Sequence, residues 1–232
     1  MIQTYREAIR EGFHEVMTKD PSVFMIGVGL SDPNACFGTL RGFYEEFGPK
    51  RVIEAPLAEA MLTGLVLGAA LMGMKPILVH QRINFAFLGM DQLINHICLY
   101  NDTYSTKQAL PIMIRGVAGE EGWGNGAQHV GSFYDLFATL KDFSDISVFH
   151  PDDGIKAKEY ILQWHLRGCT AIYTDRKELY DQHYDTEKRR FFPDPLPEVT
   201  AHERFPNQKP KPNISLHGAW KLGYESGKGT IS

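Results

Sequence analysis

The sequence predicts an α/β fold built on a doubly wound, mostly parallel six-stranded sheet. Six short apolar runs rich in β-branched residues recur along the chain, and segments with apolar residues at three- and four-residue spacing lie between them. Strands that alternate with helices form parallel sheets covered on both faces. The predicted strands are 23–28, 51–55, 76–80, 111–117, 146–150 and 170–174, and the predicted helices are 4–18, 38–47, 57–74, 90–100, 132–140 and 153–167.

Length and composition limit the possible classes. The 232 residues suffice for one complete α/β domain with an appendage. A hydrophobic content of 43% and a net charge of -4 are those of an ordinary soluble protein and do not favour nucleic-acid binding. The strand-helix pattern stops near residue 176 and gives way to charged and proline-rich sequence. We therefore expect one domain over residues 1–185 and an extended C-terminal arm over residues 186–232.

The sequence also bears on the cellular compartment. Glycine and polar residues interrupt the longest apolar stretch, so no segment is expected to span a membrane, and the N-terminus lacks the apolar core of a secretion signal. Cys36, Cys98 and Cys169 are widely separated and odd in number, which argues against a disulfide framework. We expect a cytoplasmic protein.

The predicted helix 57–74 has two unusual features. It contains Gly64, Gly68 and Gly73, and each interior glycine costs roughly 1 kcal/mol relative to alanine. Another element of the chain, or of a second subunit, is therefore expected to approach this helix closely. Its first turn carries Glu59, which by itself is interpreted as stabilising the helix dipole.

Candidate ligand contacts follow the predicted strands, because doubly wound sheets bind ligands beyond the carboxyl ends of their strands. Phe85 either covers an aromatic ligand or belongs to the core. A glycine-rich loop without a phosphate-binding fingerprint ends in Gln128 and His129. His129 is either a proton carrier or a hydrogen-bonding residue at a helix start. His150 is interpreted as mainly structural.

Two classes of site are not supported by the sequence. The nine histidines are scattered without H-x-x-x-H or H-E-x-x-H spacing, so no metal site is expected on this chain. No G-x-S-x-G motif provides the nucleophile of a hydrolase triad.

Five stretches of the chain form an ordered set that covers residues 1 to about 185. They are 51–60 with the Gly64/Gly68 helix, Asn84–Phe85 with 91–95, 111–116, 126–129 and 178–180. Together they resemble the pyrimidine-binding domain of the β subunit of the thiamine-dependent first component of 2-oxo acid dehydrogenase complexes. Transketolase is a more distant resemblance.

The resemblance implies a cofactor and a role for each matching residue. The cofactor is thiamine diphosphate, whose pyrimidine half would be bound here. Glu59 would hydrogen-bond N1′ of the aminopyrimidine and favour its imino tautomer. Phe85 would stack on the pyrimidine, and Leu57 would line the ring's site. His129 would lie near the substrate, with Gln128 as a further substrate contact.

Departures from the family pattern imply a partner. The chain lacks the Gly-Asp-Gly…Asn signature for Mg²⁺ and diphosphate, so an α-type subunit is expected to carry both, in an α₂β₂ heterotetramer with self-association. The acidic residue that the family places after the first strand is also missing, because this chain reads Gly27-Val28-Gly29-Leu30.

The expected function is that of a β-type subunit acting on a small 2-oxo acid, by decarboxylation with acyl transfer. The family's C-terminal domain is reduced here to Phe191 to Ser232, which makes two alternatives relevant. One is a transketolase-like or acyloin-forming carboligase subunit. The other is a non-catalytic scaffolding subunit that binds no cofactor.

Overall fold

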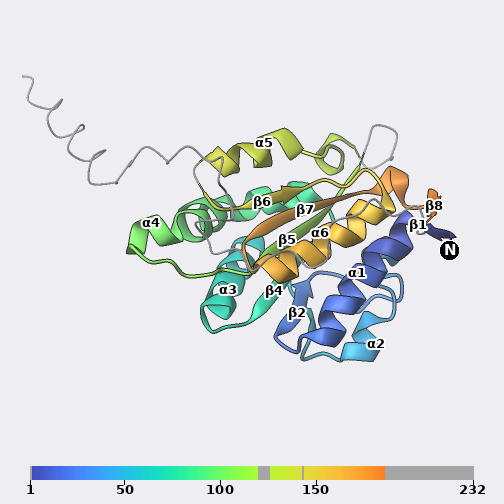
Figure 1. The fold of residues 1–232 in the computed structure, drawn as a ribbon, viewed down its shortest axis with the longest axis horizontal. Coiled ribbons are helices and arrows are strands. Elements are labelled where there is room, and N and C mark those ends of the chain that lie inside the picture. Colours follow the sequence, from blue (N-terminus) through green and yellow to red (C-terminus); the bar gives the residue numbers. More distant parts are fainter. Residues whose placement is uncertain (1, 120–125, 143, 186–232) are drawn as a thin grey trace, which may run out of the picture.

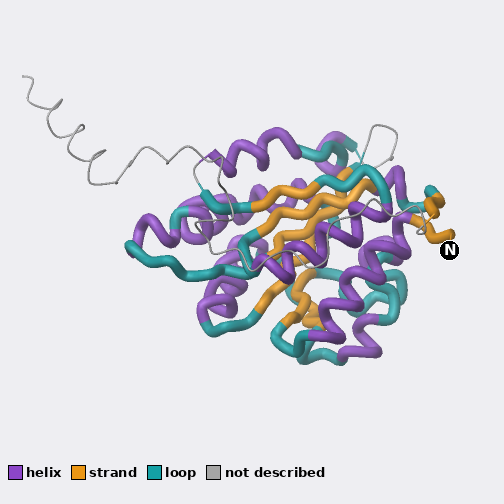
Figure 2. Tube along the Cα trace, viewed as in Figure 1, coloured by secondary structure: helices purple, strands orange, loops and turns teal. Residues whose placement is uncertain are grey.

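The computed structural model describes residues 2–119, 126–142 and 144–185. A six-stranded parallel sheet with strand order β3-β2-β4-β5-β7-β6 forms its centre (Figures 1 and 2). The strands are β2 (Val23–Gly27), β3 (Val52–Glu54), β4 (Lys75–His80), β5 (Met113–Ala118), β6 (Ser147–Phe149) and β7 (Ala171–Arg176). Each coincides with one predicted strand to within two residues at either end, so the predicted fold class is confirmed.

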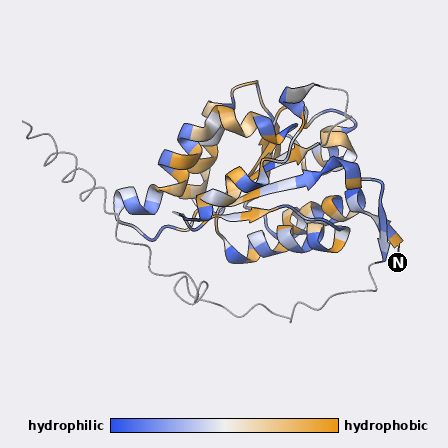
Figure 3. Ribbon diagram, turned by 90° about the horizontal axis from the view of Figure 1, so that it is seen from above, coloured by the Kyte–Doolittle hydropathy of each residue, from blue (hydrophilic) through white to orange (hydrophobic). Residues whose placement is uncertain are grey.

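Helices cover both faces of this sheet, and hydrophobic and hydrophilic residues alternate around them (Figure 3). The face that buries Phe13, Met25 and Tyr173 is covered by α1 (Tyr5–Lys19), α2 (Phe43–Phe47) and α6 (Gly154–Arg167). The opposite face is covered by α3 (Glu59–Leu71), η2 (Ile83–Gly89), η3 (Gln92–Cys98) and α5 (Tyr134–Ala138). The remaining helical segments are η1 (Ala35–Gly38), α4 (Tyr100–Tyr104), η4 (Ala127–His129), η5 (Thr139–Asp142) and η6 (Lys177–Leu179).

The two longest helices have clear start signals in the sequence. Thr4 caps α1 in a capping box with Glu7, which satisfies amides that have no partner within the helix. Asp153 caps α6 by accepting a hydrogen bond from the N–H of Lys156. Helix α6 ends at Gly168 in a left-handed conformation.

Three predicted helices are wrong in detail. The predicted helix 38–47 becomes α-helical only at α2, because Gly38 and Gly42 have positive φ angles that interrupt a right-handed helix. The segment 90–100 forms the π-helix η3, preceded by the 3₁₀ helix η2. Segment 132–140 breaks into α5 and the 3₁₀ helix η5. Apolar spacing did not distinguish these helix types.

A two-stranded antiparallel ribbon was not predicted. In it, β1 (Ile2–Thr4) pairs with β8 (His183–Asp185), which closes the domain at its two ends. The predicted arm, residues 186–232, lies outside the described residues. None of the helices within the described ranges has the length and apolar character needed to cross a membrane.

Candidate active site

The sheet has a topological switch point between β2 and β4. The segment that follows β2 leads to α2 on one face, whereas the segment that follows β4 leads to η2 on the other (Figure 1). Ligands of doubly wound sheets bind beyond the strand ends at such points. The strands approach closely here, since a Cβ on Gly27 would lie 2.3 Å from the carbonyl oxygen of Val79. Just beyond them, Gln81 Nε2 donates to the carbonyl of Val28 at 2.9 Å.

Glu59 is the first residue of α3 and is partly buried. The preceding residue, Ala58, provides no side-chain cap. The Glu59 carboxylate has no hydrogen bond or ion pair with the described part of the chain. It therefore remains available to a ligand, at a helix terminus whose free amides favour a negative charge.

The structure brings Phe85 and His129 together, as edge-to-face rings with centroids 5.8 Å apart. Phe85 lies on η2, and η2 packs directly on the first turn of α3. This contact is tight, because a Cβ on Gly89 would lie 2.3 Å from Thr63 Oγ1 and 3.3 Å from the carbonyl oxygen of Glu59. Phe85, His129 and Glu59 thus lie on neighbouring elements.

Two buried polar atoms lack partners among the described residues, namely His80 Nε2 at the end of β4 and Asn84 Oδ1 on η2. Burial lowers the pKa of His80 to about 4, so its imidazole is neutral near pH 7. An unsatisfied buried polar atom is costly. The Asn84 acceptor is adjacent in sequence to Phe85 and suits a ligand with an amino group beside an aromatic ring.

The other two predicted residues are less enclosed. Leu57 lies in the segment between β3 and α3 and is 77% exposed. Gln128 is exposed on η4, next to His129. Leu57 is connected with the site by its nearness in sequence to Glu59. Gln128 is connected with it by its nearness to His129.

Glu54 is a further candidate residue that the sequence does not indicate. It ends β3, and its carboxylate accepts hydrogen bonds from the N–H groups of Gly29 at 2.6 Å and Ser31 at 2.8 Å. Burial acts to raise the pKa of Glu54, but the backbone N–H groups outweigh it and hold that pKa below its usual range. A carboxylate from β3 therefore lies beside the loop after β2. In that loop the chain lacks the acidic residue that the family pattern places after the first strand.

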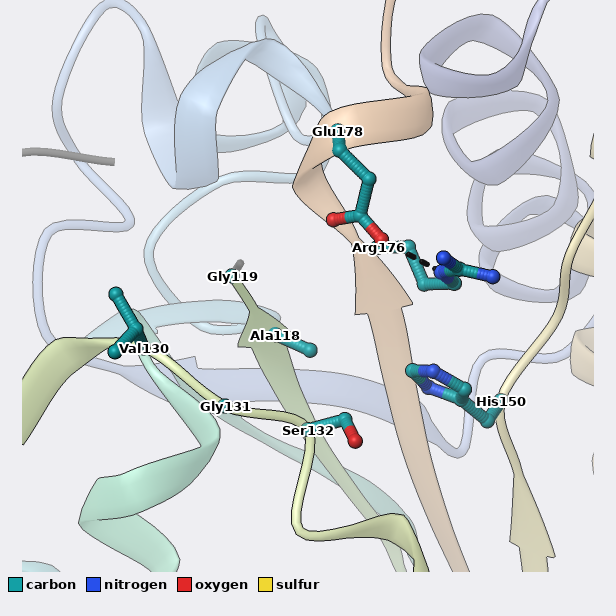
Figure 4. A pocket seen from close by; sticks show the side chains of 8 residues that line it. All are labelled: Ala118, Gly119, Val130, Gly131, Ser132, His150, Arg176 and Glu178. Carbon is teal, nitrogen blue, oxygen red and sulfur yellow. Dashed lines mark hydrogen bonds and ion pairs between the residues drawn. The ribbon is translucent and has the colours of Figure 1, made fainter. Parts of the chain in front are cut away.

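A cavity of about 430 Å³ lies beyond the ends of β5, β6 and β7 (Figure 4). We refer to it as the polar pocket. Its lining residues are Ala118, Gly119, Val130, Gly131, Ser132, His150, Arg176 and Glu178. A hydrogen bond from Gly131 N to Gly119 O, 2.7 Å long, connects the segment after His129 to the end of β5. Within the described ranges, no cluster of His, Cys, Asp and Glu could hold a metal ion.

A comparison with protein families decides the relationship. Residues 2–182 match the family "Transketolase, pyrimidine binding domain". The chain belongs to this family. The resemblance expected from the five sequence stretches is thereby confirmed.

Individual relatives agree with this assignment. The chain is 34% identical to the rice (Oryza sativa subsp. japonica) mitochondrial pyruvate dehydrogenase E1 component subunit beta-2 over 150 residues, which are 65% of this chain and 40% of that protein. It is 28% identical to the Rickettsia conorii pyruvate dehydrogenase E1 component subunit beta over 185 residues, which are 80% of this chain and 56% of that protein. The chain thus spans about half the length of these relatives.

A solved structure shares the fold. It is described as a split-gene transketolase in an inactive β4 tetramer, and it superposes with a TM-score of 0.60 at 20% sequence identity. The match covers 82% of this chain and 56% of that chain.

Proposed function

We propose that this pyrimidine-binding domain is the β-type subunit of a thiamine diphosphate enzyme that decarboxylates a 2-oxo acid and transfers the resulting acyl group. The observation that carries the proposal is the carboxylate of Glu59 in the first turn of α3, which has no partner among the described residues. Glu59 begins helix α3, and α3 packs against η2, the element that carries Phe85. The pyruvate dehydrogenase β subunits among the relatives support this reaction class.

The residues present fit the pyrimidine half of the cofactor. When bound, the cofactor supplies an electron sink for the carbon that loses carbon dioxide. Phe85 would cover the ring face, and Asn84 Oδ1 would accept a hydrogen bond from the amino group. Glu59 would hold a proton at the ring nitrogen N1′, and Leu57 would exclude water from the ring. His129, in edge contact with Phe85, would bind the substrate carboxylate or carry a proton.

The diphosphate and Mg²⁺ would be held by an α-type partner, as part of an α₂β₂ assembly. Because one cofactor would then bridge two chains, the partner must lie within a cofactor's length of Glu59. An exposed apolar stripe along α3 and its C-cap residue begins two residues after Glu59. Met61 is 52%, Leu65 43% and Met72 84% exposed, and Gly68 between them has no atom within 4 Å of an added Cβ. Such a stripe is typical of a subunit interface.

Replacing Gly68 by arginine is expected to weaken assembly with the α-type partner roughly 100-fold while leaving the subunit folded. An arginine there fills open space in the isolated chain, and glycine is the poorer helix former. In the assembly it would place a bulky charge in an apolar contact. Analytical ultracentrifugation of the mixed subunits measures the effect. Leu166→Arg, at a 65% exposed position on α6, is the matched control and should assemble normally. Unchanged assembly of Gly68→Arg would place the interface elsewhere.

Cofactor binding tests the proposed function directly. Calorimetry on the reconstituted complex should show saturable binding of thiamine diphosphate with Mg²⁺. Phe85→Ala should weaken it roughly 10-fold to 100-fold, because stacking on a heteroaromatic ring is worth about 1–3 kcal/mol. Tyr104→Ala, at a 59% exposed aromatic of α4, should bind normally. A scaffolding subunit would give no binding heat, so that result would reject the proposal.

A further inference from the structure

A second cavity, of about 410 Å³, lies at the start of α1, beside the β1–β8 ribbon (Figure 1). We refer to it as the arginine pocket. Its lining includes three arginines, two carboxylates and a glycine, namely Arg6, Arg10, Arg41, Glu7, Asp181 and Gly38. The elements around it pack on the face of the sheet that α1 and α2 cover, whereas α3 and η2, which carry Glu59 and Phe85, cover the opposite face.

Arg6 is held in place but has donors that no acceptor uses. Its Nη2 donates to Asp181 Oδ1 at 2.7 Å, and its guanidinium group lies 5.4 Å from the centre of the Tyr180 ring. Its Nε is buried and has no acceptor among the described residues. A buried cationic donor without an acceptor is costly. A negative charge in the pocket would offset this cost.

Arg10 and Arg41 extend the same cluster. Arg10 lies one turn after Arg6 on α1, so both side chains leave the same side of the helix. Arg10 Nε donates to the carbonyl oxygen of Arg41 at 3.1 Å, and Arg41 Nη2 donates to Asn34 Oδ1 at 2.7 Å. The other nitrogens of these two guanidinium groups have no acceptor within the described part of the chain. Three guanidinium groups thus line one cavity with unused donors.

Gly38 allows these groups to approach one another. Its φ of +87° is a left-handed backbone angle that favours glycine. A Cβ at this position would lie 3.3 Å from Arg6 Cδ and 3.2 Å from Asn34 Oδ1, the atom that binds Arg41. The missing side chain therefore leaves space between Arg6 and the Arg41–Asn34 pair.

The lining of the pocket carries an excess of positive charge. Its three arginines face two carboxylates, those of Glu7 and Asp181. The Glu7 carboxylate is already used by the capping box, because its Oε2 accepts from both the N–H and the hydroxyl of Thr4. The Asp181 side chain is 88% exposed, so solvent weakens its ion pair with Arg6. The excess positive charge is expected to attract an anion.

We propose that the arginine pocket is a binding site for a phosphate group, carried by a small molecule or free. Guanidinium groups bind phosphate oxygens through paired N–H donors, and three of them match a group with several oxygens and nearly two negative charges. A carboxylate has only two oxygens, which one arginine already satisfies. The cavity of about 410 Å³ also has room for the organic part of a phosphate ester. This proposal is independent of the proposed function, because it uses none of the same residues.

Calorimetry on the full chain at constant ionic strength tests the proposal with three probes, namely glycerol 3-phosphate, inorganic phosphate and succinate. We expect saturable binding of a phosphate probe, at least about 10-fold tighter than that of succinate. Arg10→Gln and Arg41→Gln should each weaken this binding roughly 10-fold, because each removes charge-assisted hydrogen bonds. Tighter binding of glycerol 3-phosphate would identify a phosphate ester as the ligand, and tighter binding of inorganic phosphate would identify free phosphate.

The matched control is Lys50→Gln, which removes one positive charge at an exposed position before β3 and should leave the affinity unchanged. A second measurement needs no variant. In the wild-type full chain with ¹⁵N-labelled arginine, the phosphate probe should shift the Nε signals of Arg6 and Arg10. The Nε signal of Arg115, which is bonded to Asp175, should not move. If neither phosphate probe binds, if succinate binds as tightly, or if Lys50→Gln weakens binding as much as Arg10→Gln, the proposal is wrong.

Discussion

Glu59→Gln is expected to lower the turnover of the assembled enzyme by about 10²–10⁴-fold, the range typical of a lost proton-transfer group. The amide keeps the size of the side chain but cannot hold a proton for a ring nitrogen. Little else should change, because the Glu59 carboxylate has no partner among the described residues and contributes only a helix-dipole interaction of a few tenths of a kcal/mol. Turnover, thermal midpoint and cofactor affinity are measured on the same preparation.

The matched control is Glu45→Gln. Glu45 is also an acidic residue in the first turn of a helix, on α2, and it is exposed. Its variant should retain full turnover. If Glu59→Gln retained wild-type turnover in the complex, Glu59 would be a helix-stabilising residue and the assignment of the site would be wrong.

Arg115→Met is expected to destabilise the domain by about 3–5 kcal/mol, which is a large part of the free energy of unfolding of an ordinary domain. Arg115 and Asp175 are fully buried, and they form two hydrogen bonds, of 3.2 Å and 2.7 Å, between β5 and β7. The same network holds Thr39 and Tyr180. Methionine would leave a buried carboxylate without its cation. Urea denaturation measures the loss.

A double variant tests whether the loss of stability comes from the unpaired buried charge. Arg115→Met combined with Asp175→Leu removes both charges, so its loss of stability should be clearly smaller than that of Arg115→Met alone. Lys156→Met breaks the exposed Lys156–Asp152 pair and should cost at most about 1 kcal/mol. If Arg115→Met cost less than about 1 kcal/mol of stability, the result would mean that solvent reaches the buried Arg115–Asp175 pair.

The sheet was predictable from sequence because each parallel strand is a short buried run between amphipathic segments. The type of each helix was not predictable, because the apolar spacing in η2 and η3 resembles that of an α-helix. The β1–β8 ribbon also escaped prediction. It joins two three-residue segments from opposite ends of the described domain, and no local pattern records such pairing.

The candidate site, like the fold, was only partly predictable from the sequence. The sequence motifs predict Phe85 and His129 as site residues, and the structure places their rings in contact. Glu54 was missed because its partners, Gly29 and Ser31, are brought to it by the pairing of β2 with β3. His150 was interpreted as mainly structural. Its hydrogen bonds to Thr174 agree with that role, but only the three-dimensional arrangement shows that it also lines a cavity.

The β1–β8 ribbon has a consequence for how such a domain is joined to others during evolution. Ile2 pairs with Asp185, so both ends of the described domain leave from one corner. Another polypeptide can be gained or lost at either end without moving a strand of the central sheet.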